Sequence, residues 1–210
     1  MYMTEINEYR QNLQPLILSE AERLFRQKGI KSVTMEEISK NLHISKRTIY
    51  ELYTNKEEVL IEVLKNVIKQ RTQHLEKFSK SCSNVMDILI ESFRIQLQTS
   101  LNTNPKFFHD IEKYPGAKAM LQKHHENERK ASQDFLMQGI KQGYFLPNVN
   151  LDIFMRIVSV TKGAILNDPQ LKKLTFNELL NNYIYIITRG FCTQKGLVKF
   201  DEFMNNYNKA

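Results

Sequence analysis

The chain has 210 residues, of which 41% are hydrophobic and 25% charged, and it carries a formal charge of +7. Seven glycines and five prolines are too few for the many tight turns of an all-β fold, and two cysteines cannot form a disulfide framework. No run approaches the roughly 18 consecutive apolar residues of a membrane span, and the polar N-terminal sequence lacks the order of a signal peptide. We therefore expect a cytoplasmic protein.

The first predicted element is a helix from about Tyr9 to Lys28, where apolar residues recur at steps of three and four and line one face. Gly29 follows at the position where a helix C-cap favours a residue that can adopt positive φ. A short connection then leads to a second helix.

Two short helices come next. Thr34-Met35-Glu36-Glu37 has the pattern of a capping box, in which the Thr34 hydroxyl accepts from the Glu37 amide and the Glu37 carboxylate accepts from the Thr34 amide. Ser45 is a good N-cap for a third helix, from Lys46 to about Tyr53. Because only a short turn separates the two helices and a longer helix precedes them, the pattern predicts a helix-turn-helix.

The rest of the chain continues with helical periodicity. Thr54-Asn55-Lys56-Glu57 has the pattern of a second capping box and begins a long fourth helix. Further apolar stripes, ending with a helix from Phe176 to Thr193, predict an all-α fold of about nine helices without a strand. No linker precedes the long helix, so we predict a helix-turn-helix domain over residues 1–56, joined directly to a helical domain over 57–210.

The stretch from Ile17 to Leu60 resembles the N-terminal domain of the TetR family of bacterial transcription regulators. The matching features, in order, are Ala21, the Leu24-Phe25 pair, Gly29, Thr34, Ile38, the turn before Ser45, the Ile49-Tyr50 pair, Tyr53 and the segment Asn55-Lys56-Glu57. The resemblance implies a DNA-binding head joined to a helical domain for effector binding and dimerisation. It also implies a repressor that a small, mostly apolar effector releases from palindromic operator DNA, with activation as an alternative.

The first turn of the third helix carries the candidate DNA contacts. A recognition helix reads the major groove with side chains near its N-terminus, where Lys46, Arg47 and Thr48 lie. The resemblance implies that Arg47 and Thr48 read bases and that Thr34, Lys46, Tyr50 and Lys56 hold phosphates. The predicted DNA-binding residues are Thr34, Ser45, Lys46, Arg47, Thr48, Tyr50, Tyr53 and Lys56.

Two residues depart from the family's pattern. His43 stands where the turn usually has glycine, and histidine tolerates a left-handed backbone better than most residues. Leu52 stands where the family often has a polar aromatic residue or histidine that touches phosphate. The turn can therefore form with some strain, and one backbone contact to DNA is missing.

The last two helices are apolar on more than one face, which indicates burial against a second partner as well as their own core. The resemblance implies a homodimer interface here, and the alternative is a central position in a monomer. The predicted interface residues are Phe154, Ile157, Tyr183, Ile187 and Phe191. The resemblance also implies an effector pocket among the middle helices, with ordinary core packing as the alternative for each residue; its candidates are Phe93, Leu97, Phe107, Phe108, Tyr114 and Met120.

Two other classes of function compete with this one. The C-terminal part could serve a protein partner or constitutive dimerisation, with no small ligand. A helical metal-dependent enzyme is the third class, since His109 and Glu112 are three residues apart and His124 could approach from the next helix. Solvated surface positions are favoured for these side chains, because neither HxxxH nor CxxC spacing nor a nucleophile motif is present. We therefore expect no enzyme activity, metal or cofactor.

Overall fold

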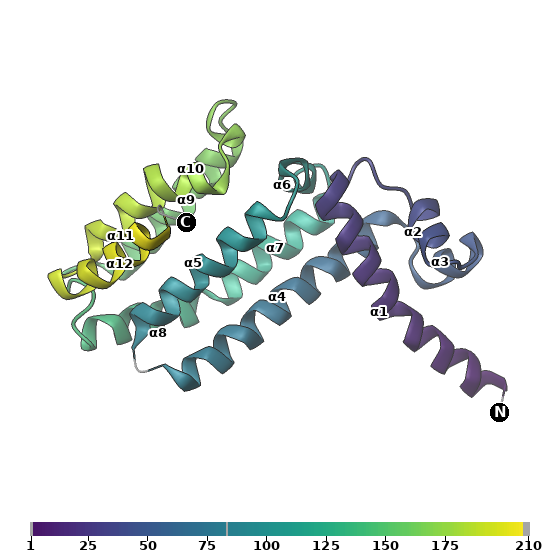
Figure 1. Cartoon of the computed structure of the whole chain (residues 1–210), viewed down its shortest axis with the longest axis horizontal. Helices are drawn as coiled ribbons and strands as arrows, with labels where there is room; N and C mark the ends of the chain where they lie inside the picture. The colour runs from purple at the N-terminus through teal and green to yellow at the C-terminus, as the bar shows by residue number, and fades with distance from the viewer. Residues whose placement is uncertain (1, 83, 208–210) are drawn as a thin grey trace. The chain divides into compact units, whose positions relative to one another are not determined.

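The computed structural model describes residues 2–82 and 84–207, which are helical apart from turns, loops and one isolated bridge between Phe145 and Cys192 (Figure 1). The all-α prediction is confirmed. The α-helices are α1 (Tyr2–Lys28), α2 (Met35–Asn41), α3 (Lys46–Leu52), α4 (Lys56–Ser81), α5 (Val85–Leu101), α6 (Pro105–Ile111), α7 (Pro115–Asn127), α8 (Arg129–Lys141), α9 (Leu151–Asn167), α10 (Phe176–Leu179), α11 (Tyr185–Phe191) and α12 (Gln194–Tyr207).

The C-terminal region differs in detail from the prediction. The helix expected from Phe176 to Thr193 contains a π-helical segment, Leu180–Ile184, between α10 and α11, and it ends at Phe191. A further helix, α12, follows. Its buried residues, Gly196, Phe200 and Met204, recur at steps of four. Leu197, Phe203 and Tyr207 pack against the same core, so this helix has an apolar face that the prediction missed.

The described residues fall into two compact units. One lies within Met1–Arg71 and Leu101–His124, and the other within Thr72–Ser100 and His125–Ala210. A boundary therefore falls inside α4. The first unit extends beyond the helix-turn-helix because α6 and the start of α7 pack with α1 and α4 rather than with the later helices.

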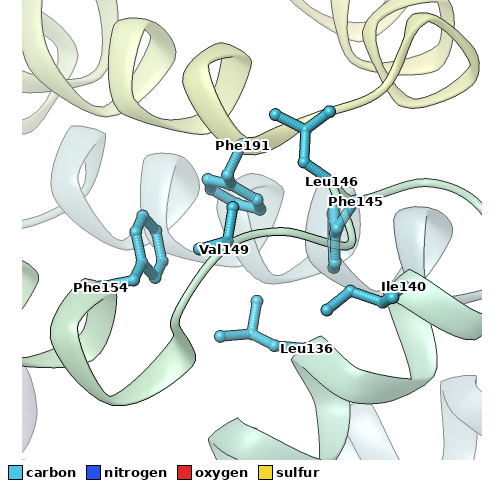
Figure 2. Close-up of a pocket in the computed structure, with 7 residues that line it drawn as sticks. All are labelled: Leu136, Ile140, Phe145, Leu146, Val149, Phe154 and Phe191. Carbon is cyan, nitrogen blue, oxygen red and sulfur yellow. The ribbon is translucent and has the colours of Figure 1, made fainter.

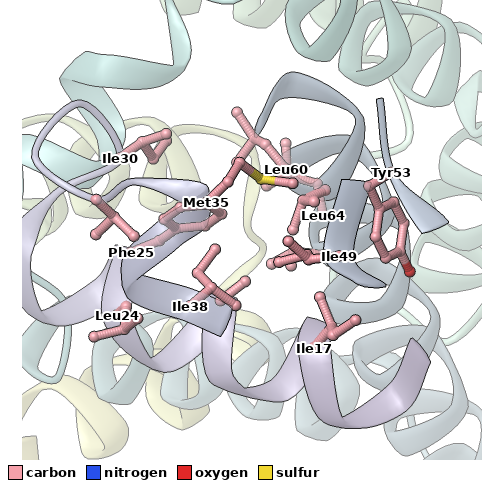
Figure 3. Packing of buried hydrophobic residues seen from close by; sticks show 14 of the residues in the cluster. Ile17, Leu24, Phe25, Ile30, Met35, Ile38, Ile49, Tyr53, Leu60 and Leu64 are labelled. Atoms are coloured by element: carbon pink, nitrogen blue, oxygen red, sulfur yellow. The ribbon is translucent and has the colours of Figure 1, made fainter. Parts of the chain in front are cut away.

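The core of the first unit forms where α1 to α4 converge. Apolar residues at helical spacing on α1 meet one residue from α2 and one from α3, all with no solvent exposure (Figure 3). These residues are Ile17, Ala21, Phe25, Ile38 and Ile49. Since α2 and α3 are only seven residues long, this burial rather than helix propensity holds them in place.

Two residues with positive φ shape the chain around α2, as predicted. Gly29 has a φ of 82°, and a Cβ there would lie 2.8 Å from the Cβ of Lys106 on α6. His43, in the turn between α2 and α3, has a φ of 54° and is the one non-glycine residue with positive φ among those described. Its amide donates to the Lys40 carbonyl at 3.1 Å, so the turn closes despite the side chain.

We expect His43→Gly to raise the free energy of unfolding by about 0.5–1 kcal/mol, because a left-handed residue with a Cβ is strained and glycine is not. The imidazole is exposed, so its removal costs little packing. Urea denaturation measures the change. Lys40→Gly, at an exposed helical position, is the control and should lower the stability by a similar amount. Equal losses in both variants would show that the turn is unstrained.

The core of the second unit is rich in aromatic rings. Phe191 on α11 lies edge to face with Phe145 and Phe154, each with ring centroids 4.9 Å apart. Phe200 on α12 is fully buried, with its ring centroid 5.7 Å from that of Phe93 on α5. The Phe200 ring also lies 5.6 Å from that of Tyr185 on α11, so aromatic contacts join α5, α11 and α12.

Candidate nucleic-acid interface

The N-terminus of α3 is organised by its cap. Ser45 Oγ accepts a hydrogen bond from the Thr48 amide at 3.0 Å, as predicted, and it also shares a hydrogen bond with Thr48 Oγ1 at 2.8 Å. The cap fixes the first turn of α3 and leaves the amides of Lys46 and Arg47 at an exposed helix end. Such an end favours an anion.

Both basic side chains of this turn are exposed and paired with a carboxylate. The Arg47 side chain is 89% exposed, and its Nε donates to Glu51 at 2.8 Å. The Lys46 ammonium pairs with Glu36 on α2, and this hydrogen bond raises the pKa of Lys46. The same ammonium lies 5.7 Å from the centre of the exposed Tyr50 ring. These side chains form one exposed surface on α3.

Thr34 caps α2 as predicted, since its hydroxyl accepts from the Glu37 amide at 3.1 Å. The Glu37 carboxylate, which was expected to accept from the Thr34 amide, pairs with Lys28 at the end of α1. Thr34 is exposed. The capping hydroxyl can therefore still donate its hydrogen to a phosphate.

The second capping box is shifted by one residue from the predicted position. Asn55 Oδ1 accepts from the Glu58 amide at 3.0 Å, and the Glu58 carboxylate accepts from the Thr54 amide at 2.7 Å. The shift leaves Glu57 to accept from the Gly116 amide at 2.6 Å, at the beginning of α7. Glu57 therefore joins the first turn of α4 to α7 within the first unit.

Lys56 has a structural role that the sequence did not suggest. Its ammonium donates to the carbonyls of Ile30, Val33 and Lys31, at 2.8, 2.7 and 3.3 Å. Burial lowers the pKa of Lys56, while the charge of Asp110 acts in the opposite direction. Because an ammonium has three donors, a phosphate contact would require Lys56 to leave these carbonyls. The structure thus assigns Lys56 to the loop between α1 and α2.

Tyr53 is also used inside the protein. Its side chain is 5% exposed and belongs to the core of the first unit (Figure 3). Burial raises the pKa of Tyr53 to about 12, so its hydroxyl stays neutral. Leu52, the departure from the family's pattern, packs against the same core. Of the eight predicted DNA-contacting residues, those on the exposed surface are Thr34, Ser45, Lys46, Arg47 and Tyr50, with Thr48 half-buried beside them.

Helix α6 fastens the end of α1 and the following loop. The buried Asp110 carboxylate accepts from the Lys31 amide at 2.8 Å and from Lys113 at 2.7 Å. Burial raises the pKa of Asp110, but these hydrogen bonds outweigh it and lower the pKa overall. The Asn104 amide adds a 2.7 Å hydrogen bond to the Arg26 carbonyl. Sequence reasoning missed these contacts, because a lone aspartate on a short helix carries no signal of its distant partner.

The six predicted effector-pocket residues are divided between the two units. Phe107, Tyr114 and Met120 belong to the core of the first unit, whereas Phe93 and Leu97 belong to that of the second. Phe108 is 44% exposed. Neither unit by itself therefore holds the predicted pocket.

A small apolar cavity lies elsewhere in the second unit (Figure 2). Its volume is about 10 Å³, which is at the lower limit for one water molecule. The lining side chains come from α8, α9, α11 and the segment before α9; they are Leu136, Ile140, Phe145, Leu146, Val149, Phe154 and Phe191. Phe154 and Phe191, which were predicted for a dimer interface, thus line this small cavity.

The other predicted interface residues lie on or near a partly exposed apolar face. Ile153, Ile157 and Val160 recur at steps of four and three on α9, and they are 58%, 52% and 64% exposed. On α11, Ile186 is 62% exposed and Ile187 is half-buried, and Tyr183, in the π-helical segment before α11, is also half-buried. We call the exposed residues Ile153, Ile157, Val160 and Ile186 the α9–α11 apolar face.

The metal-enzyme alternative gains no support from the described residues. They contain no group of three or more His, Cys, Asp and Glu side chains placed to hold a metal ion. Glu112, one of the residues considered for a metal, pairs with Lys118 at 2.7 Å. Every helix within the described ranges is too short or too polar to cross a bilayer.

Known proteins match the chain in both sequence and fold. The family model for bacterial regulatory proteins of the tetR family matches residues 17–63. The HTH-type transcriptional repressor KstR2 of Mycobacterium tuberculosis is 21% identical over 150 residues, covering 69% of this chain and 75% of that protein. The uncharacterised HTH-type regulator YvaF of Bacillus subtilis is 26% identical over 178 residues, covering 83% of this chain and 93% of that protein.

Solved structures share the fold. A transcriptional regulator from Saccharomonospora viridis, in complex with choline, superimposes with a TM-score of 0.61 at 15% identity, over 88% of this chain and all of that one. The fatty acid degradation regulator FadR from Bacillus halodurans gives a TM-score of 0.60 at 15% identity, over 83% of this chain and 94% of that one. The matched segment spans the capped helix-turn-helix described above, with its core and exposed basic turn. The helix-turn-helix at residues 17–63 is thus that of the tetR family of bacterial regulatory proteins.

Proposed function

We propose that this protein is a homodimeric transcriptional repressor that binds a palindromic operator through α3 and is released by a small, mostly apolar effector. The observation that carries the proposal is the exposed basic turn of α3. Arg47 is 89% exposed on a helix whose other face is buried in the core. A helix anchored in this way can enter a major groove with the Arg47 side chain directed toward the base edges.

The side chains of this surface divide by the chemistry they offer. Arginine has a planar fork of donors that matches O6 and N7 of guanine, so Arg47 suits base reading. Lysine is a flexible point charge, so Lys46 suits phosphate, and the hydroxyls of Thr34 and Tyr50 suit phosphate oxygens. Lys46 would exchange its carboxylate partner, Glu36, for DNA on binding.

The α9–α11 apolar face supports dimerisation. Exposed aliphatic side chains recur at helical spacing on α9, and α11, which contacts α9 through the rings of Phe154 and Phe191, exposes Ile186. Water solvates such side chains poorly. A second copy of the same face would cover it through a twofold axis. Two recognition helices related by such an axis read a palindrome with half-sites about one helical turn apart.

Effector release rests on the apolar character of the second unit. KstR2 is named a repressor, and the S. viridis regulator was crystallised with choline. The cavity in Figure 2 is wholly apolar in its lining, which suits a mostly apolar ligand. Its volume of about 10 Å³ also favours the second candidate, a constitutive regulator without a ligand. For release, the effector must bind the non-operator conformation more tightly.

Selection of bound duplexes from a random pool tests the proposal, at about 150 mM salt to suppress sequence-blind binding. We expect a palindromic motif. Arg47→Ala should weaken binding to that motif by about 1–3 kcal/mol per contacted base pair, and it should relax the preference at that position. His109→Ala, on the exposed side of α6, is the control and should change neither. Binding that shows no sequence preference and falls steeply with salt would contradict the proposal.

A further inference from the structure

Glu51 lies one helical turn after Arg47 on the exposed side of α3, and its contact with Arg47 has a specific geometry. Of the nitrogens of the guanidinium, Nε is the one that donates to the carboxylate, at 2.8 Å. Within the described part of the chain, no residue accepts a hydrogen bond from Nη1 or Nη2 of Arg47. The Arg47 side chain is 89% exposed and that of Glu51 is 39% exposed.

This geometry leaves free the edge of the guanidinium that recognises guanine. Bidentate reading of O6 and N7 needs two parallel donors and a fixed plane. A free arginine samples many rotamers and loses them on binding, whereas an arginine held at Nε has already lost part of that freedom. The carboxylate can therefore orient Arg47 without occupying its reading edge.

The charge of Glu51 acts in the same direction. Sequence-blind affinity for DNA comes mainly from cations that neutralise phosphates. A carboxylate on the recognition helix repels phosphate and offsets the charge of Arg47. A contact between Arg47 and a DNA phosphate therefore contributes less binding free energy than a contact between Arg47 and a base. Lys46 differs, because its partner Glu36 lies on another helix and lysine is a point charge without a reading edge.

We propose that Glu51 is a specificity-determining residue, which positions Arg47 to read guanine and disfavours its contact with phosphate. The inference rests on the proposed function. It assigns to Glu51 an effect on the discrimination between sequences, rather than a contribution to overall affinity.

The test measures dissociation constants by fluorescence anisotropy for the wild type, Glu51→Ala, Glu51→Gln and Arg47→Ala. The DNAs are the selected operator, a set with each base pair changed singly, and an unrelated duplex. We expect Glu51→Ala to bind the unrelated duplex about two- to fivefold more tightly, because one negative charge is lost. At the base pair read by Arg47, its discrimination should fall about five- to tenfold.

Two further variants separate orientation from charge. Glu51→Gln keeps an oxygen that can accept from Nε, so it should keep most of the discrimination while binding the unrelated duplex more tightly, like Glu51→Ala. In the double variant with Arg47→Ala, Glu51→Ala should cause no further loss of discrimination. Glu62→Ala, which breaks an exposed pair with Lys65 on α4, is the matched control and should leave all the constants unchanged.

The inference is overturned if Glu51→Ala binds every duplex more tightly by one common factor and discriminates as well as the wild type. Glu51 would then be an ordinary surface partner of Arg47. Thermal unfolding of each variant verifies that the head is folded, so a change in discrimination cannot come from misfolding. Failure of the wild type to select any motif would overturn the proposed function itself, which is a distinguishable result.

Discussion

Replacing Ile157 by glutamate is expected to convert a dimer into a monomer. Operator binding should then weaken by about 10²–10⁴-fold, because a single helix-turn-helix domain can no longer bind both half-sites together with a linked partner. Ile157 is 52% exposed in the middle of the apolar residues of α9. In a twofold interface each substitution occurs twice, so two carboxylates would be buried without a partner. Analytical ultracentrifugation measures the mass in solution, and anisotropy measures the affinity for the operator.

Leu101→Glu is the matched control, since Leu101 is 72% exposed and lies outside the α9–α11 apolar face. It should remain dimeric with unchanged affinity. A dimer that persists in Ile157→Glu at micromolar concentration would contradict the proposed interface. If the variant is monomeric but binds the operator as tightly as the wild type, dimeric reading is contradicted.

Lys56→Met should lower the free energy of unfolding by roughly 2–4 kcal/mol. Methionine keeps most of the aliphatic stem but cannot donate to the carbonyls of Ile30, Lys31 and Val33. In the variant, those carbonyl oxygens in the loop between α1 and α2 would lose the ammonium as a hydrogen-bond donor. Urea denaturation gives the change, and operator binding should fall mainly through the loss of folded protein.

The same substitution at Lys65, which pairs with Glu62 on the surface of α4, should change the stability by less than about 0.5 kcal/mol. Lys56→Met also separates the structural role of Lys56 from the phosphate contact that the family resemblance implies. If the variant is as stable as the wild type but binds DNA weakly, the result would support the phosphate contact and contradict the structural role of Lys56.

Local features of the fold could be predicted because they depend on neighbouring residues. Ser45 and Thr34 cap helices whose amides lie three residues away, and Gly29 and His43 adopt the positive φ that their positions require. The apolar stripe of α1 could likewise be predicted, because its apolar residues recur at steps of three and four. These features were enough to define a helix-turn-helix.

Long-range partners could not be predicted in this way. Lys56 reaches carbonyls more than 20 residues earlier, and Asp110 reaches an amide 79 residues earlier. Backbone acceptors carry no side-chain signal, so only the family resemblance suggested a role for Lys56, and that role was a phosphate contact. The candidate effector residues were apolar residues of the middle helices, where the family resemblance implies a pocket. Phe93 on α5 and Phe107 on α6 nevertheless belong to two different cores.

The small volume of the cavity in Figure 2 would affect how a ligand bound there is detected. A ligand larger than water would need the surrounding phenylalanines to move, so it would bind a minor population of the protein. Its apparent dissociation constant then equals the intrinsic constant divided by the fraction of open molecules. Screens on the resting protein would therefore rank true ligands as weak, whereas variants with smaller side chains around the cavity would reveal their intrinsic strength.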